Sequence, residues 1–219
     1  MNMNYHPWKS LLLVLTLAAM MVYPVDAQKA ELAVIGGYRF SGNLGGADTG
    51  SESDQLLNEL KVDNNLNFGA LIDYTISETI QLELLYDRQP TTLSRTNSGT
   101  GAVNSFDTTI DYLHFGFLFR KSAGTLRPFL GMTFGGTFIR PDGLQNESRT
   151  SVGIALGVKS FVSDRLGFRL QSRIMSSYFP QSSETFCDQN GNCYDYRASF
   201  FLNQIDLSAG IILSLGSNR

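Results

Sequence analysis

The sequence has little charge, few prolines, only two cysteines and no long hydrophobic run after its N-terminal segment. Charged residues make up 17% of the 219 residues, below the roughly 25% that is usual for soluble domains. Beyond residue 27 no run approaches the ~18 consecutive apolar residues of a spanning helix. Six prolines and a low charge content do not fit a disordered chain. A net charge of −3 argues against nucleic-acid binding.

The first 27 residues have the layout of a secretory signal peptide. Lys9 supplies a positive charge, residues 11–22 form a short apolar stretch, and Val25 and Ala27 are small residues placed for cleavage before Gln28. The stretch is shorter than the ~18 residues that a membrane anchor needs. We therefore predict a signal peptide at 1–27 and one exported domain at 28–219.

The two cysteines, Cys187 and Cys193, both lie in the predicted mature chain and flank the turn-forming pair Asn190-Gly191. An even number of cysteines in an exported protein indicates a disulfide. We predict that Cys187 and Cys193 form one and pin a surface hairpin, and their oxidation state is an open question. A calcium site is the alternative for this segment, but its glycine is displaced from the calcium-loop position and no Glu ends the loop.

After residue 28 the hydrophobic pattern repeats every two residues, which is typical of strands with one apolar face. In the clearest case, Ile80, Leu82 and Leu84 alternate with Gln81 and Glu83. The fold class is therefore all-β. We expect eight strands, at approximately 30–40, 61–76, 79–89, 105–120, 126–139, 150–162, 166–178 and 198–215.

The predicted connections alternate between long and short, which places all the long ones at one end of the sheet. The short connections lie at 77–78, 121–125 and 163–165, and the long polar ones at 41–60, 90–104, 140–149 and 179–197. This is the arrangement of an antiparallel up-and-down transmembrane β-barrel of the bacterial outer membrane. Ten strands, with an extra pair drawn from the long connections, are an alternative.

The two faces of the predicted strands differ in polarity. One face is almost entirely Phe, Leu, Val and Ile, and these large side chains suit lipid better than the narrow interior of an eight-stranded barrel. The other face carries the charges that we expect to line the lumen as a structural network, at Glu83, Asp87, His114, Arg169, Arg173 and Asp206. Because buried charges must pair, we expect a salt-bridge cluster of Glu83, Arg169, Arg173 and Asp206 that plugs the lumen, with a gated ion path as the alternative. Aromatic residues near strand ends suit interfacial girdles: Tyr38, Phe40, Tyr74, Tyr86, Phe119, Phe138, Phe161 and Tyr178.

The segments QLELLYDRQP, IDYLHFGFLFRKSAGTLRPFLGMTFGG and SVGIALGVKSFVSDRLGFRLQSRI resemble the outer membrane protein β-barrel domain family, the small eight-stranded barrels of the OmpA and OmpX type. The resemblance covers essentially all of residues 28–215. It rests on the placement of strands, turns and glycines, so it implies the fold far more specifically than the function. It implies an outer-membrane location and a surrounding of lipid and lipopolysaccharide, and we expect a monomer.

The last predicted strand looks like the terminal signal that the β-barrel assembly machinery reads. Its polar, glycine and apolar positions are Ser208, Gly210, Leu213 and Leu215. It departs from the usual form because Leu215 replaces an aromatic residue and four further residues follow. The resemblance therefore implies the assembly machinery as a partner.

Three functions are compatible with such a barrel. The favoured one is a non-enzymatic barrel with a plugged lumen that serves envelope structure or surface interaction through four long outer loops, the first of which, 41–60, is acidic. The alternatives are a narrow channel and a lipid A-modifying enzyme that uses His114, for which no motif selects partner residues. A soluble periplasmic barrel with its apolar face inward is a fourth reading. We expect no catalytic residues, no metal and no cofactor.

Overall fold

The computed structural model describes residues 30–44, 60–96, 103–121, 125–143, 145–180, 184–185, 194–195 and 200–215. The predicted signal peptide and both cysteines lie outside these residues. Eight antiparallel strands form the body of the molecule. They are β1 (Ala30–Ser41), β4 (Asn65–Thr75), β5 (Ile80–Thr96), β6 (Val103–Arg120), β7 (Leu126–Pro141), β8 (Glu147–Phe161), β9 (Leu166–Phe179) and β12 (Phe200–Ser214).

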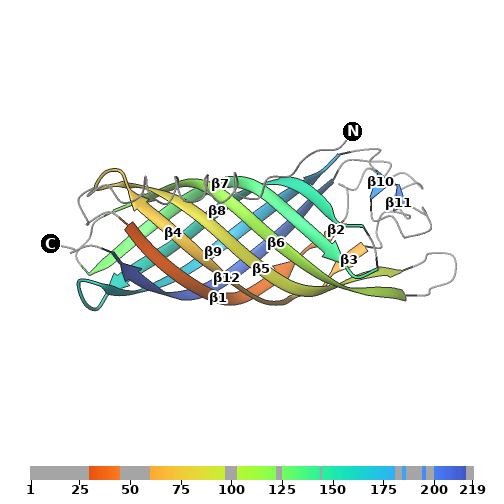
Figure 1. Ribbon diagram of the computed structural model, residues 1–219, viewed down its shortest axis with the longest axis horizontal. Coiled ribbons are helices and arrows are strands. Elements are labelled where there is room, and N and C mark those ends of the chain that lie inside the picture. Colours follow the sequence, from red (N-terminus) through yellow and green to blue (C-terminus); the bar gives the residue numbers. More distant parts are fainter. Residues whose placement is uncertain are drawn as a thin grey trace, which may run out of the picture.

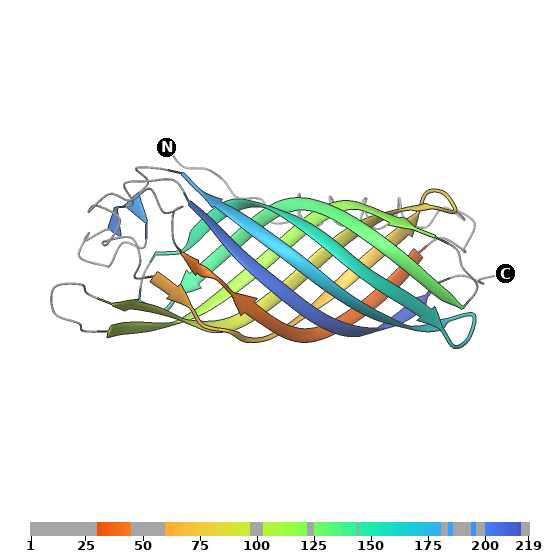
Figure 2. The same ribbon diagram turned by 180° about the vertical axis from the view of Figure 1, so that it is seen from behind.

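The eight strands pair in chain order, and the sheet closes because β1 also pairs with β12. The seam runs from Glu31 opposite Ser214 to Ser41 opposite Gln204. Figure 1 shows the resulting cylinder from one side, and Figure 2 shows β1 and β12 next to each other on the opposite wall. The prediction of an all-β, eight-stranded antiparallel barrel is confirmed, and the ten-strand alternative is wrong.

The strands are strongly staggered around the barrel. Starting from Glu31, the paired residues lead from strand to strand once around the wall and return to β1 at Ser41, ten residues further along. In an eight-stranded barrel such a stagger requires strands that tilt by about 35–45° from the axis. This tilt is visible in Figures 1 and 2.

The two ends of the barrel differ. Short turns join β4 to β5 and β8 to β9, and each is closed by a backbone hydrogen bond, from Ile76 N to Ile80 O and from Val162 N to Leu166 O, both 3.0 Å long. The short strands β2 (Asn43–Leu44), β3 (Leu60–Val62), β10 (Glu184–Thr185) and β11 (Tyr194–Asp195) lie at the other end (Figure 1). Within the described residues, no helix is long and apolar enough to cross a membrane.

The single strand expected at 61–76 is divided into β3 and β4. Between the pairs Val62–Leu93 and Phe68–Arg88, the β3–β4 side uses one residue more than β5, which is a β-bulge. The Asp63 carbonyl accepts a hydrogen bond of 2.6 Å from Thr91 Oγ1 instead of a ladder bond. Strand β5 also extends to Thr96, well past the predicted end at residue 89, because its polar outer part carries no alternation to detect.

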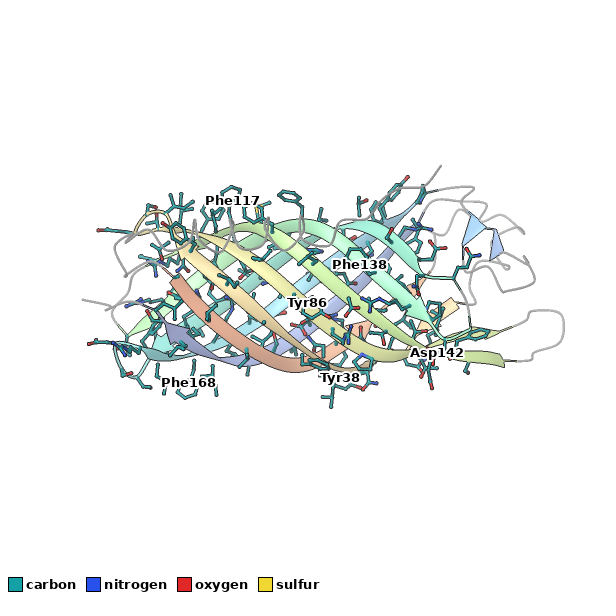
Figure 3. All side chains as sticks on the ribbon, viewed as in Figure 1. Tyr38, Tyr86, Phe117, Phe138, Asp142 and Phe168 are labelled. Carbon is teal, nitrogen blue, oxygen red and sulfur yellow. The ribbon has the colours of Figure 1, made fainter. Side chains whose placement is uncertain are left out.

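The outer wall of the barrel is apolar and the lumen is polar. The wall exposes large side chains on every strand, and Phe117 and Phe168 project from it in Figure 3. The charged residues predicted for the lumen are all buried. A soluble barrel with its apolar face inward is therefore excluded. Phe161, which we expected in a girdle, is instead half-buried and packs against buried apolar residues of the interior. The Arg127 guanidinium lies over its ring, 4.6 Å from the ring centre.

Candidate functional site in the lumen

A cluster of charged side chains fills the lumen near the short-turn end. Lys159 on β8 lies at its centre, with Nζ 2.5 Å from Glu31 Oε2, 2.7 Å from Asp73 Oδ2 and 2.8 Å from Gln81 Oε1. Its partners come from β1, β4 and β5, so the contacts cross the barrel. The Lys159 side chain is 1% exposed, and three acceptors replace the water that its ammonium group has lost.

Two arginines of β9 continue this cluster. Arg169 donates to Asp73 Oδ2 at 2.8 Å and to Glu83 Oε2 at 2.5 Å, and Arg173 donates to Glu83 Oε1 at 2.6 Å. Glu83 thus uses both carboxylate oxygens, one for each arginine. The Arg169 guanidinium also stacks on the Phe129 ring, 4.5 Å from its centre. Glu31, Lys159, Asp73, Arg169, Glu83 and Arg173 form one continuous chain of ion pairs, which we call the inner ion cluster.

A second group of charges surrounds Arg39 on β1. Arg39 Nη2 lies 2.6 Å from Asp87 Oδ1 and 3.9 Å from Asp206 Oδ2. The other oxygen of Asp87 accepts from Asn67 Nδ2 at 2.9 Å. The Arg39 guanidinium lies over the Tyr112 ring, 5.0 Å from its centre. We call Arg39, Asp87 and Asp206 the upper ion cluster.

Side-chain hydrogen bonds connect the two clusters. Arg169 Nε donates to Gln171 Oε1 at 2.8 Å, and Gln171 Nε2 donates to Ser208 Oγ at 3.1 Å. The Ser208 hydroxyl then donates to Asp206 Oδ1 at 2.7 Å. The lumen charges therefore belong to one network that runs through strands from all sides of the barrel.

His114 on β6 contacts hydroxyl groups. Its Nδ1 lies 3.1 Å from Thr133 Oγ1 and its Nε2 lies 2.7 Å from Ser151 Oγ. Thr137 Oγ1 bridges Ser151 and Ser177, at 2.8 and 2.7 Å. A nucleophile–base–acid set needs an acid that orients the base, and among the described residues no carboxylate is hydrogen-bonded to His114. The ring is 1% exposed.

The long-loop end of the interior is apolar. Buried side chains from six strands pack there, and each is at most 3% exposed. They are Val62, Leu93, Ile110, Ile139, Phe179 and Leu202. This apolar cap and the inner ion cluster fill opposite ends of the same narrow interior.

The structure places all six predicted lumen residues inside the barrel but in three separate surroundings. Glu83, Arg169 and Arg173 are in contact, Asp87 and Asp206 face Arg39, and His114 lies among hydroxyls. Five charged members of the network were missed by the sequence analysis: Glu31, Arg39, Asp73, Lys159 and Arg120, which pairs with Glu31 at 3.7 Å. Their signal was present, because each is a charged residue at the polar position of an alternating segment.

Three residues of the predicted assembly signal lie on β12, and Leu215 directly follows its last residue, Ser214. Ser208 points inward to Asp206 and Gln171, whereas Leu213 and Leu215 are exposed on the outer wall. Gly210 pairs with Ile35 across the seam. The predicted disulfide partners, Cys187 and Cys193, lie outside the described residues. Thr185 and Tyr194, which come before and after these cysteines in the chain, are paired in the β10–β11 ladder.

The geometry defines a class of protein. A closed antiparallel barrel with an apolar exterior and a charged, buried interior is a transmembrane β-barrel of the bacterial outer membrane. The family model "Outer membrane protein beta-barrel domain" matches residues 11–201, so the chain belongs to this family. The protein is therefore an outer-membrane protein surrounded by membrane lipid.

Solved structures show the same fold at low sequence identity. The chain is similar to Neisserial surface protein A, with 12% identity, 85% of this chain and 97% of that chain covered, and a TM-score of 0.54. It is also similar to OprG from Pseudomonas aeruginosa, with 11% identity, coverage of 86% and 97%, and a TM-score of 0.52. No curated protein sequence matches the chain.

Proposed function

We propose that the protein is a non-enzymatic outer-membrane barrel with a closed lumen, serving envelope structure or surface interaction through its long-loop end. The observation that carries this proposal is the inner ion cluster. Its carboxylates and cations come from β1, β4, β5, β8 and β9 and meet across the lumen at 2.5–2.8 Å. An open water path needs space that these side chains occupy.

The energetics support a closed lumen. An eight-stranded barrel has an interior just wide enough for side chains to fill. The charges of the inner ion cluster satisfy one another, so moving one member aside leaves its partner buried and unpaired, at a cost of about 3–5 kcal/mol. The apolar cap adds a second obstruction at the long-loop end. Ion passage would have to disturb both.

The surroundings of His114 support a non-enzymatic role. The ring is enclosed by the wall and its neighbours Thr133 and Ser151, and its 1% exposure leaves no room for a lipid substrate. If lipid A modification were the function, deleting the gene should change the lipid A mass spectrum. We expect the lipid A profile to stay unchanged. A lipid A modification that disappears both on gene deletion and in His114→Ala would overturn the non-enzymatic proposal.

Single-channel recording of the refolded protein in planar bilayers tests the closed lumen. We expect no steady conductance from the wild type and measurable conductance from Glu83→Ala/Arg173→Ala, which removes two side chains from the inner ion cluster. The shift between boiled and unboiled samples on a denaturing gel confirms that each sample is folded. Steady wild-type conductance would overturn the closed lumen and favour a narrow channel.

Replacement of residues 97–102 by a Gly-Ser linker tests the surface role. The linker joins Thr96 to Val103, which are already paired in the β5–β6 ladder, so the gel shift should remain. Binding of intact cells to an immobilised extracellular-matrix protein is compared with and without residues 97–102, and we expect the replacement to reduce it. Loss of the gel shift would contradict the proposed separation between a folding barrel and interacting loops.

A further inference from the structure

The carboxylate of Asp111 lies on the outer side of the barrel, within its apolar part. On β6, side chains at odd positions from Leu113 to Phe119 are exposed on the lipid-facing wall, and Asp111 continues this series. Its side chain is nevertheless only 1% exposed. An ionisable residue on a lipid-facing surface is unfavourable, so its presence calls for a partner.

Three side chains of the neighbouring strands cover Asp111. Arg88 on β5 donates from Nε to Oδ1 at 2.7 Å and from Nη2 to Oδ2 at 3.3 Å. Arg140 on β7 forms an ion pair with Oδ2 through its Nη2. The Tyr86 hydroxyl donates to Oδ1 at 2.9 Å. We call Tyr86, Arg88, Asp111 and Arg140 the wall arginine cluster.

The wall arginine cluster carries more positive than negative charge. Two guanidinium groups share one carboxylate, and their side chains are 36% and 45% exposed. Each guanidinium has five N–H donors. Asp111 contacts two nitrogen atoms of Arg88, Nε and Nη2, and one of Arg140, Nη2. Two further carboxylates lie closer to the long-loop end, Asp107 on β6 and Asp142 directly after β7. Among the described residues, neither forms an ion pair with Arg88 or Arg140.

The cluster lies where the wall changes from apolar to polar. On β5 the outward side chains run from Leu84 and Tyr86 to Arg88 and then to Pro90 and Thr92. Along β7 they run from Phe134 and Phe138 to Arg140, and Asp142 follows the strand. Figure 3 shows Tyr86 and Phe138 on the wall and Asp142 near the long-loop end. Because the long loops of outer-membrane barrels lie outside the cell, we assign this boundary to the height of the lipid headgroups in the outer leaflet.

The sector of the wall formed by β1, β9 and β12 has aromatic residues in place of such charges. Toward the long-loop end, the outward positions hold Tyr38 and Phe40 on β1, and Tyr178 and Phe201 pack together on β9 and β12, with ring centres 5.2 Å apart. Within the described strands, outward arginines at this boundary occur only on β5 and β7. The positive charge is therefore confined to one sector of the aromatic boundary.

We propose that the wall arginine cluster binds a phosphate group of lipid A in the outer leaflet. Arginine forms short, charge-assisted hydrogen bonds with phosphate oxygens, often two at once. Asp111 holds both guanidinium groups in place, and their excess positive charge faces the phosphates, while the acyl chains lie along the apolar wall below. The site lies outside the lumen, so it stands whether or not the lumen conducts.

Native mass spectrometry of the refolded protein in detergent tests this site. The probes are bisphosphorylated lipid A and the same lipid after removal of both phosphates. We expect the wild type to prefer the phosphorylated lipid, and Arg88→Gln and Arg140→Gln each to reduce that preference roughly tenfold, the effect of one charge-assisted contact. The double variant should bind both lipids equally.

Three controls keep the proposal falsifiable. Arg165→Gln makes the same charge change in an exposed turn at the opposite end of the barrel and should leave the preference unchanged. Arg140→Lys keeps the charge. It should show the gel shift of a folded barrel and retain part of the preference for phosphorylated lipid A. Excess inorganic phosphate should not displace lipid A, because it lacks acyl chains. Equal wild-type binding of the two lipids, a preference that survives in the double variant, or displacement by phosphate would each overturn the site.

Discussion

The molecule holds arginine–carboxylate clusters in two different surroundings. In the inner ion cluster, Arg169 and Arg173 are 0% and 2% exposed and share Glu83. In the wall arginine cluster, Arg88 and Arg140 share Asp111 but are 36% and 45% exposed. The ratio of two guanidinium groups to one carboxylate is the same at both centres. What differs is where the remaining positive charge is neutralised.

Inside the barrel, the remaining charge is neutralised by the protein. Asp73 and Glu31 bring Arg169 and Lys159 into the same chain of ion pairs, so each charge has a fixed partner. On the wall, no further carboxylate within the described residues pairs with Arg88 or Arg140. A buried cluster has to satisfy its own charges, whereas a cluster at the membrane boundary can leave some of them to lipid and water.

The largest effect is expected from Glu83→Ala, which breaks the inner cluster. It leaves Arg169 and Arg173 without their shared carboxylate in a buried lumen, and should lower the free energy of unfolding by about 3–5 kcal/mol. Urea unfolding in lipid vesicles measures this. Asp142→Asn, an exposed change, should cost less than about 0.5 kcal/mol. A cost below about 1 kcal/mol for Glu83→Ala would mean that water already screens the lumen.

A somewhat smaller effect is expected from Leu84→Arg, which places an unpaired arginine on the wall. Leu84 lies on the same face of β5 as Arg88, four residues closer to the short-turn end. An arginine near the bilayer midplane of a barrel costs about 2–4 kcal/mol, and near the interface about 0–1 kcal/mol. The same urea titration compares Leu84→Arg with Tyr38→Arg, at the boundary. Equal costs would contradict the membrane position that we assign to the wall.

A glycine pair sharpens the comparison between the two faces. A Cβ at Gly116, which faces inward, would meet the Met132 carbonyl oxygen and lie 2.6 Å from Thr133 Cα, whereas one at outward-facing Gly36 would lie 4.0 Å from its nearest contact. Gly116→Ala should therefore cost about 1–3 kcal/mol through overpacking. Gly36→Ala should change stability little. The ranking fails if the two variants unfold at the same urea concentration.

The smallest effect on the barrel is expected from the cysteines. Thiol alkylation followed by mass spectrometry should add no label to the native protein and two labels after reduction, if Cys187 and Cys193 are bonded. Reduction should leave the gel shift unchanged, because the predicted bond lies outside the eight-stranded wall. Labelling without reduction would show that the disulfide prediction is wrong.

The wall and the strand count could be predicted because lipid and lumen impose opposite chemistry on alternate residues. Leu82, Leu84 and Tyr86 against Gln81, Glu83 and Asp87 are enough to assign the two faces of one strand. The signal weakens where the strand leaves the membrane. For that reason the outer half of β5, with Pro90, Thr91 and Thr92, was expected to be loop.

The pairing of charges could be predicted only in part: Glu83, Arg169 and Arg173 meet as expected, but Asp206, expected in the same cluster, faces Arg39 instead. Alternation places Glu83, Arg169, Arg173 and Asp206 on one face, but it does not give their height or their position around the barrel. Those depend on the stagger, which brings Glu83 to both arginines while Asp206 faces Arg39. Asp111 could have been noticed, since it interrupts an apolar face, but its two arginines come from other strands.

The seam between β1 and β12 has a consequence for biogenesis. The strand that carries Ser208, Gly210 and Leu213 has both of its edges occupied in the finished barrel, by β1 on one side and β9 on the other. Any factor that reads an edge of this strand must do so before the seam closes. An unpaired edge of the terminal strand is therefore available for recognition only before the barrel closes, and a closed barrel can no longer present it.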